Sequence, residues 1–329
     1  MRSFRCPTCA QLVFFENSTC LRCGQELGYD PLRHDLVAAD TEPRCANAAI
    51  AACNWIPSRA GAPCLSCRLT RTRPADSDTE AMAAFAATEA AKRRLVAQLF
   101  ELGLPLRSWA DRDGGLAYDL LSSRDAAVVI GHQDGVVTID LAESDDPHRE
   151  QVRQEMGEPY RTMLGHLRHE TGHYYWTVLV EGTPHLQRFR ELFGDERASY
   201  ADAVDRHYAQ GPPADWPDAH VSAYATMHPW EDWAETFAHY LHIRDTLQTA
   251  GEHGIRVEAP EASLSADPGD VDADAEPFEE ILAAWLPLTY ALNAVNRAMG
   301  RDDLYPFVLP PPVVEKLAWV HRLCTAPGS

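Results

Sequence analysis

The sequence contains no apolar run that approaches the roughly 18 residues of a membrane-spanning helix. Its first residues, Met1 to Cys6, also lack the apolar stretch and the small-residue cleavage site of a secretory signal. A hydrophobic content of 45% is ordinary for a folded globular protein. Together these features predict a globular protein of the cytoplasm that does not bind membranes.

Positive charge is scarce, because 29 Lys and Arg face 49 Asp and Glu and leave a net charge of −20. Residues 1–75 hold nine arginines and six acidic residues, so the remaining chain has 20 basic and 43 acidic residues. Such an acidic body repels nucleic acid and anionic lipid. We therefore expect no nucleic-acid partner.

Cysteine is almost absent after residue 67, because eight of the nine cysteines lie in the first 67 residues. The odd count and the C-x-x-C spacing favour metal binding over disulfides. Two such pairs, ten residues apart, predict a closed four-cysteine zinc site that has no room for substrate. This set is typical of a zinc ribbon and consists of Cys6, Cys9, Cys20 and Cys23.

A second cysteine set has spacings of seven, ten and two residues and consists of Cys45, Cys53, Cys64 and Cys67. It predicts a second structural zinc site, because a short segment with few large apolar side chains needs such stabilisation. In the alternative, Cys45 and Cys53 are ordinary buried thiols. The sequence thus predicts one or two structural zinc ions, and Cys324 as a free thiol.

A boundary is predicted near residue 75, between a zinc-ribbon domain (1–75) and a larger domain (76–329). A helix over 80–102 begins the larger domain, and Asp134-Gly135 predicts a hairpin turn among short strands. The segment 257–276 has seven acidic and no basic residues and predicts a flexible loop. The predicted strands are 116–121, 127–130 and 136–141; further helices are 146–157, 186–193, 200–208, 278–299 and 313–323.

The stretch His169-Glu170-Thr171-Gly172-His173 is an H-E-x-x-H sequence. Residues four apart lie on one face of a helix, so His169 and His173 can bind one metal ion with Glu170 beside its open position. A catalytic zinc ion takes three protein ligands and a water molecule. His166, one turn earlier, is expected to support the site or the fold rather than to bind metal.

A second helix is predicted to begin at Pro229, with Glu231 and Glu235 on one face. Glu231, 58 residues beyond His173, is the expected third ligand. Glu235 would accept the second ring N–H of a zinc-bound histidine and fix its orientation. Two alternatives stay open: Glu235 is the ligand, or His228 replaces Glu231.

These residues predict hydrolysis by a zinc-activated water. Zinc lowers the pKa of a bound water to about 7, and Glu170 would accept its proton and pass it to the leaving amine. Tyr224, just upstream of the second helix, would share the oxyanion with the metal. In the alternative, Tyr224 is only a packed aromatic residue.

Glu231-Asp-Trp-Ala-Glu235 resembles the E-x-x-A-[DE] helix of the gluzincin branch of zincin metallopeptidases, whose first acid binds zinc and whose second orients a histidine. The whole chain resembles a bacterial family of zinc-binding metallopeptidases with an N-terminal zinc ribbon. This likeness rests on the ribbon cysteines, the run 157–161 and both motifs, while the second cysteine set departs from a single ribbon. It implies an α+β fold, with a mostly helical, zincin-like catalytic domain and a small β-sheet after a Cys-rich zinc-ribbon domain.

The leading functional hypothesis is a zinc-dependent peptidase that acts on a peptide or protein substrate, with the ribbon recruiting a protein partner. An edge of the predicted sheet could pair with an extended peptide. The alternative is a non-catalytic zinc-binding scaffold with a peptidase-like fold. A nucleic-acid-binding ribbon protein is a third hypothesis, which the charge disfavours.

Overall fold

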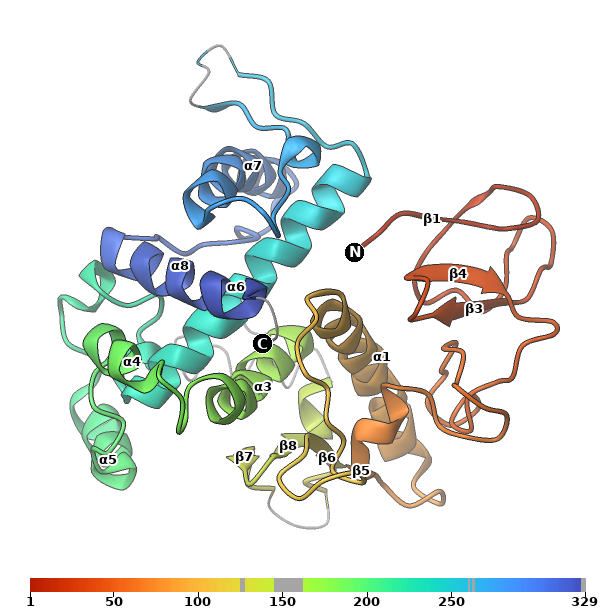
Figure 1. Ribbon diagram of the computed structural model, residues 1–329, viewed down its shortest axis with the longest axis horizontal. Coiled ribbons are helices and arrows are strands. Elements are labelled where there is room, and N and C mark those ends of the chain that lie inside the picture. Colours follow the sequence, from red (N-terminus) through yellow and green to blue (C-terminus); the bar gives the residue numbers. More distant parts are fainter. Residues whose placement is uncertain (125–127, 145–161, 260, 262–263, 327–329) are drawn as a thin grey trace. The chain divides into compact units, whose positions relative to one another are not determined.

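The computed structural model describes residues 1–329 except 125–127, 145–161, 260, 262–263 and 327–329. The chain divides into two compact units, Met1–Leu167 and Arg168–Ser329. Figure 1 shows that the strands lie in the first unit and that most helices lie in the second. The fold is thus mixed helix and sheet, with a Cys-rich N-terminal segment. The boundary predicted at residue 75 remains a prediction.

Two small antiparallel hairpins build the Cys-rich segment. Strand β1 (Phe4–Arg5) pairs with β2 (Leu12–Val13), and β3 (Leu27–Asp30) pairs with β4 (Asp35–Ala38). A cluster of buried aromatic rings fills the space between them, with Phe15 and Tyr29 centroids 4.7 Å apart. Its members are Phe4, Phe15, Tyr29 and Trp55. This core is small, so the cysteine clusters must carry part of the stability.

A four-stranded sheet follows, in the order β5-β6-β8-β7. The first three strands are parallel, and β7 joins β8 as an antiparallel hairpin. Its turn residues Asp134 and Gly135 both have positive φ, 50° and 85°, as the predicted tight turn requires. The strands are β5 (Thr70–Thr72), β6 (Ala117–Leu121), β7 (Gly131–Gln133) and β8 (Val136–Asp140). Two of the predicted strands are thereby confirmed as β6 and β8.

The strand predicted over 127–130 is wrong. Residues 128–130 form no strand, and β7 lies at Gly131–Gln133 instead. The tight turn fixes the register, Gln133 opposite Val136, and pairing extends only three residues from it. Val129 is consequently exposed despite its strand propensity. Hydrophobic composition alone overestimated the length and misplaced the position of this edge strand.

Helix α1 (Thr79–Glu101) matches its prediction, and Asp78 caps it by accepting a hydrogen bond from the Ala81 amide at 2.9 Å. Its buried face includes Lys92, whose Nζ lies 2.6 Å from Glu89 Oε1. Lysine occurs at only one other position in the chain, Lys316, and both lysines are buried. The short 3-10 helices η1 (Cys67–Leu69) and η2 (Leu141–Ser144) precede β5 and follow β8, respectively.

The second unit is helical, and its long helix α6 (Pro229–Glu252) contacts α4, α7 and α8. In Figure 1, α8 crosses α6 near its middle. Among the described residues, no helix has both the length and the apolar content of a membrane span. Helix α3 (Met163–Leu179) has its first five residues in the first unit and the rest in the second. The remaining elements are α4 (Leu186–Phe193), α5 (Tyr200–Gln210), η3 (Trp216–Asp218), η4 (Tyr224–Thr226), η6 (Pro268–Asp270), α7 (Phe278–Ala298) and α8 (Pro311–Thr325).

The helix predicted over 146–157 lies outside the described residues. The acidic segment 257–276 is mainly loop, as predicted, but it contains η6. This short helix approaches the end of α6 closely, because a Cβ on Gly251 would lie 3.0 Å from the Pro268 carbonyl oxygen. This part of the segment, η6, therefore packs on α6.

Helices α3 and α6 approach each other closely at Gly172. A Cβ at that position would lie 3.2 Å from Ala234 Cα, so the glycine permits the contact. Trp233 Nε1 donates a hydrogen bond of 2.8 Å to the Gly172 carbonyl oxygen. The fully buried Trp233 ring then packs on Phe237 and Trp319. This contact sets the distance between the two helices that carry the predicted metal ligands.

Candidate metal centre

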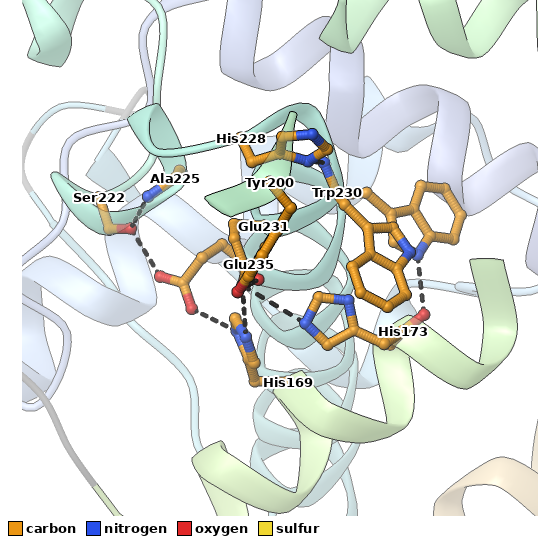
Figure 2. Close-up of polar contacts among 11 residues, drawn as sticks. His169, His173, Tyr200, Ser222, Ala225, His228, Trp230, Glu231 and Glu235 are labelled. Carbon is orange, nitrogen blue, oxygen red and sulfur yellow. Dashed lines mark hydrogen bonds and ion pairs between the residues drawn. The ribbon is translucent and has the colours of Figure 1, made fainter. Parts of the chain in front are cut away.

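The two helices bring His169, His173 and Glu231 together in the second unit (Figure 2). Glu231 Oε2 lies 3.0 Å from His169 Nε2 and 3.3 Å from His173 Nε2. All three side chains are buried, and their potential ligand atoms lie within 4.8 Å of one another. Residues four apart on α3 thus face one carboxylate from α6, as the sequence predicts.

The start of α6, which carries Glu231 in its first turn, is fixed by a capping histidine and a proline. His228 caps the helix, because its Nδ1 accepts a hydrogen bond from the Trp230 amide at 3.1 Å. Its Nε2 donates to the Ala198 carbonyl oxygen, also at 3.1 Å. Pro229 follows in the first turn, where its missing N–H costs nothing. His228 therefore lies outside the cluster, with both ring nitrogens used in local structure, which argues against it replacing Glu231.

Glu235 lies on the other side of the His169 ring. Its Oε1 accepts a hydrogen bond of 2.7 Å from His169 Nδ1, and its Oε2 accepts one of 2.6 Å from Ser222 Oγ. His169 is thereby held with Nε2 directed at Glu231. This geometry favours Glu231 over Glu235 as a metal ligand. Ser222 was not predicted, because no spacing rule connects it with Glu235.

The electrostatics of the cluster are those of two carboxylates that compete for positive charge. Burial raises the pKa of Glu231, but His173 and His169 lower it well below its usual value. Burial likewise opposes the effect of His169 on Glu235, whose pKa falls to about 2. For His169, burial lowers the pKa, whereas Glu231 and Glu235 raise it far above normal. A cation held between these groups would satisfy the same charges.

Two tyrosines border the cluster. The ring of Tyr224, the predicted oxyanion donor, lies 5.8 Å from that of His169 between centroids. Tyr200, which was not predicted, donates a hydrogen bond of 2.8 Å to Glu231 Oε1. Burial and then the Glu231 charge raise the pKa of both phenols, and Glu170 raises them further. Both hydroxyls consequently stay protonated near neutral pH. The buried Glu170 lies close enough for its charge to affect the pKa of each phenol.

Further contacts fix the walls of the site. The Trp230 ring packs on His173, with centroids 4.3 Å apart. Next to Glu231, the Asp232 carboxylate is buried against Lys316 of α8, at 2.6 Å. Burial raises the pKa of Asp232 to about 7 despite this lysine. In the first unit, His166 pairs with Glu143, in keeping with a supporting role rather than metal binding.

The eight N-terminal cysteines form two separate clusters of reduced thiols. In the first, the Sγ atoms of Cys6 and Cys23 lie 3.6 Å apart; in the second, those of Cys53 and Cys64 do. Cys45 Sγ accepts a hydrogen bond of 3.3 Å from the Cys64 amide. The full sets are Cys6, Cys9, Cys20 and Cys23, and Cys45, Cys53, Cys64 and Cys67. Cys45 and Cys53 are therefore part of a four-cysteine cluster rather than isolated buried thiols. Cys324 is buried in the second unit.

The donor sets fit zinc. Four thiolates at one point make a closed tetrahedral site, and two imidazoles with one carboxylate make a site with an open fourth position. The set of His169, His173 and Glu231 also has Glu235 behind His169. Such an outer carboxylate raises the basicity of a metal-binding imidazole. Each of the three clusters thus has the residues that a zinc ion requires.

Comparison with known proteins agrees with this chemistry. The chain belongs to a family described as "Putative zinc-binding metallo-peptidase", whose profile matches residues 81–323. A zinc-ribbon domain matches residues 3–78. The family resemblance inferred from the sequence is thereby confirmed, including its N-terminal ribbon.

Similar proteins occur in Mycobacterium tuberculosis and Mycobacterium bovis, and both are named only as uncharacterized proteins. Each is 54% identical to this chain over 330 residues, which cover 98% of this chain and 95% of the relative. No solved structure matches the chain.

Proposed function

We propose that this protein is a zinc-dependent peptidase of the zincin type, with the gluzincin arrangement of two histidines and a later glutamate. The observation that carries the proposal is the buried cluster of His169, His173 and Glu231, with Glu235 hydrogen-bonded to the far side of His169. One zinc ion would bind there and two in the cysteine clusters. The cytoplasm is the proposed location, because cysteines grouped in metal-binding clusters are typical of a reducing compartment.

A zinc ion in this cluster would polarise a peptide carbonyl and lower the pKa of a bound water to about 7. His169, His173 and Glu231 would hold the ion, and Glu235, by accepting the Nδ1 proton of His169, would fix the tautomer and the orientation of that ring. Glu170, beside His169 on α3, would accept the proton of the attacking water and donate it to the leaving amine. Tyr224 would donate a hydrogen bond to the carbonyl oxygen as negative charge develops on it.

The direct test is Glu170→Gln, assayed with unfolded casein and with a mixed library of quenched-fluorescence peptides. We expect the variant to keep the fold and the zinc content of the wild type and to lose hydrolysis. Glu181→Gln, an exposed change just after α3, serves as the matched control and should retain full turnover. Unchanged turnover in Glu170→Gln would contradict the mechanism. Zinc bound with no turnover of any substrate by the wild type would favour a scaffold.

The zinc ribbon is the proposed site for recruiting a protein, because it exposes large apolar side chains around its metal knuckles. Leu21, between Cys20 and Cys23, is 99% exposed, and Phe14 is 62% exposed. A protein partner that covers these side chains would remove their apolar surface from water. Leu21→Asp should slow hydrolysis of a protein substrate and leave a short peptide unaffected. An equal effect on both substrates would contradict recruitment by the ribbon.

A further inference from the structure

Tyr200 contacts the candidate metal centre from an element that is otherwise almost entirely exposed. It is the first residue of α5, in which only Ala203 is buried. The Tyr200 side chain is itself 42% exposed, yet its hydroxyl lies 2.8 Å from Glu231 Oε1 (Figure 2). A surface helix therefore places one polar atom on a buried carboxylate, 31 residues further along the chain.

The two oxygens of Glu231 have different surroundings. Oε2 lies between His169 Nε2 and His173 Nε2, at 3.0 and 3.3 Å. Oε1 accepts the hydrogen bond of Tyr200. A carboxylate oxygen that accepts a hydrogen bond has less electron density to offer a metal ion, and its position is fixed by the donor.

We infer that Tyr200 is a positioning residue that holds Glu231 as a one-oxygen metal ligand and so keeps the fourth coordination position open for water. The inference rests on the proposed function, because it presumes a metal ion between His169, His173 and Glu231. Without the Tyr200 hydroxyl, Oε1 is free to turn towards the ion and to occupy the position that the attacking water needs.

The surroundings of Tyr200 show how it can do this from an exposed helix. Its ring makes edge contacts with His228 and Trp230, at centroid distances of 5.4 and 6.3 Å. Both residues belong to the start of α6, beside Glu231 itself. Ser199 caps α5 by accepting a hydrogen bond from the Asp202 amide, which fixes the backbone next to Tyr200. The ring packing and the helix cap thus orient the hydroxyl.

Tyr208, near the other end of α5, provides a matched control. It is 68% exposed, and its ring contacts that of His207. Phenylalanine at either position keeps the ring and removes only the hydroxyl. A role in positioning Glu231 predicts a change in metal coordination for Tyr200→Phe and none for Tyr208→Phe.

The experiment replaces the metal of the His169 site with Co²⁺ in the full-length protein. A chelator removes bound metal, Co²⁺ is added, and the visible spectrum is recorded as a difference against His169→Ala treated in the same way, so that Co²⁺ in the cysteine clusters cancels. For the wild type we expect the strong absorption of a four-coordinate ion. For Tyr200→Phe we expect weaker bands from a higher coordination number, and an affinity for Co²⁺ changed by about 10-fold, as with other outer contacts of metal ligands.

The outcomes separate this inference from the proposed function. A Tyr200→Phe protein with the wild-type spectrum and affinity overturns the positioning role and leaves the peptidase proposal intact. If Tyr200→Phe keeps the wild-type spectrum but loses kcat at constant KM, the Tyr200 hydroxyl acts on substrate instead, and the positioning role is again overturned. A wild type that takes up no Co²⁺ at His169 overturns the proposed function itself. Altered coordination in Tyr200→Phe, with wild-type coordination in Tyr208→Phe, supports the inference.

Discussion

Gly172, inside the H-E-x-x-H sequence, allows the two helices that carry the candidate metal ligands to approach each other. An alanine there would place its Cβ 3.2 Å from Ala234 Cα and 3.3 Å from the Ala234 carbonyl oxygen. Carbon atoms in good contact lie about 3.5–4.0 Å apart, so the helices must separate by roughly 0.3–0.8 Å. Both obstructing atoms belong to the backbone, which cannot rotate away as a side chain would.

The cost of Gly172→Ala is the difference between two effects. Overpacking in a core destabilises by about 1–3 kcal/mol, whereas alanine is favoured over glycine in a helix by about 1 kcal/mol. We therefore expect a net loss of about 1 kcal/mol, or a Tm lower by about 2–4 °C for a unit of this size. The Trp233 hydrogen bond to the Gly172 carbonyl oxygen should lengthen as the helices part.

The assay is thermal unfolding combined with zinc affinity by chelator competition. Because Gly172 precedes His173, separation of the helices also moves this ligand away from Glu231, and zinc should bind more weakly. Repeating the substitution in a His169→Ala background isolates the packing cost from the loss of metal. A Tm equal to or above that of the parent protein in both backgrounds would refute the reasoning.

Other expected results follow from the same contacts. Glu235→Gln removes the charge behind His169 and should weaken zinc binding about 10- to 100-fold in chelator competition, and an unchanged affinity would exclude its role. Burial lowers the pKa of His239 to about 4, so the unfolded chain binds a proton first as the pH falls below about 6.5. His239 should therefore account for about 3 kcal/mol of the stability lost between pH 6.5 and 4 in metal-stripped protein, and His239→Gln should reduce the total loss in urea titrations; an equal loss in the variant would contradict the assignment. Lys92 and Lys316 are buried in ion pairs, so amine-reactive reagents should leave both unmodified until the protein unfolds, as peptide mass spectrometry would detect.

The cluster of His169, His173 and Glu231 could be predicted from the sequence because it depends mainly on spacing within single helices. Four-residue spacing places His169 and His173 on one face of α3, and a similar rule relates Glu231 to Glu235 on α6. Only the meeting of the two helices is non-local, and Gly172 gave no separate indication of it in the sequence. Local spacing also predicted the first cysteine cluster, because each C-x-x-C pair forms its own tight turn.

Other features depend on contacts that spacing does not reveal. Tyr200 and Ser222 lie 31 and 13 positions before the glutamates that they contact. The edge strand β7 was displaced from its predicted place because the turn at Asp134 sets its register. Cys45 and Cys53 have irregular spacing, so the sequence left the alternative of ordinary buried thiols open, and the folded segment places both beside Cys64 and Cys67, as the second predicted site requires.

The most direct test of the central claim is the zinc content of the purified full-length protein and of His169→Ala, measured by inductively coupled plasma mass spectrometry. Three clusters of metal-binding side chains predict three zinc ions per wild-type chain. His169→Ala should keep two, because the cysteine clusters do not involve that helix. An identical zinc content in the two proteins would contradict the assignment of a metal ion to His169, His173 and Glu231.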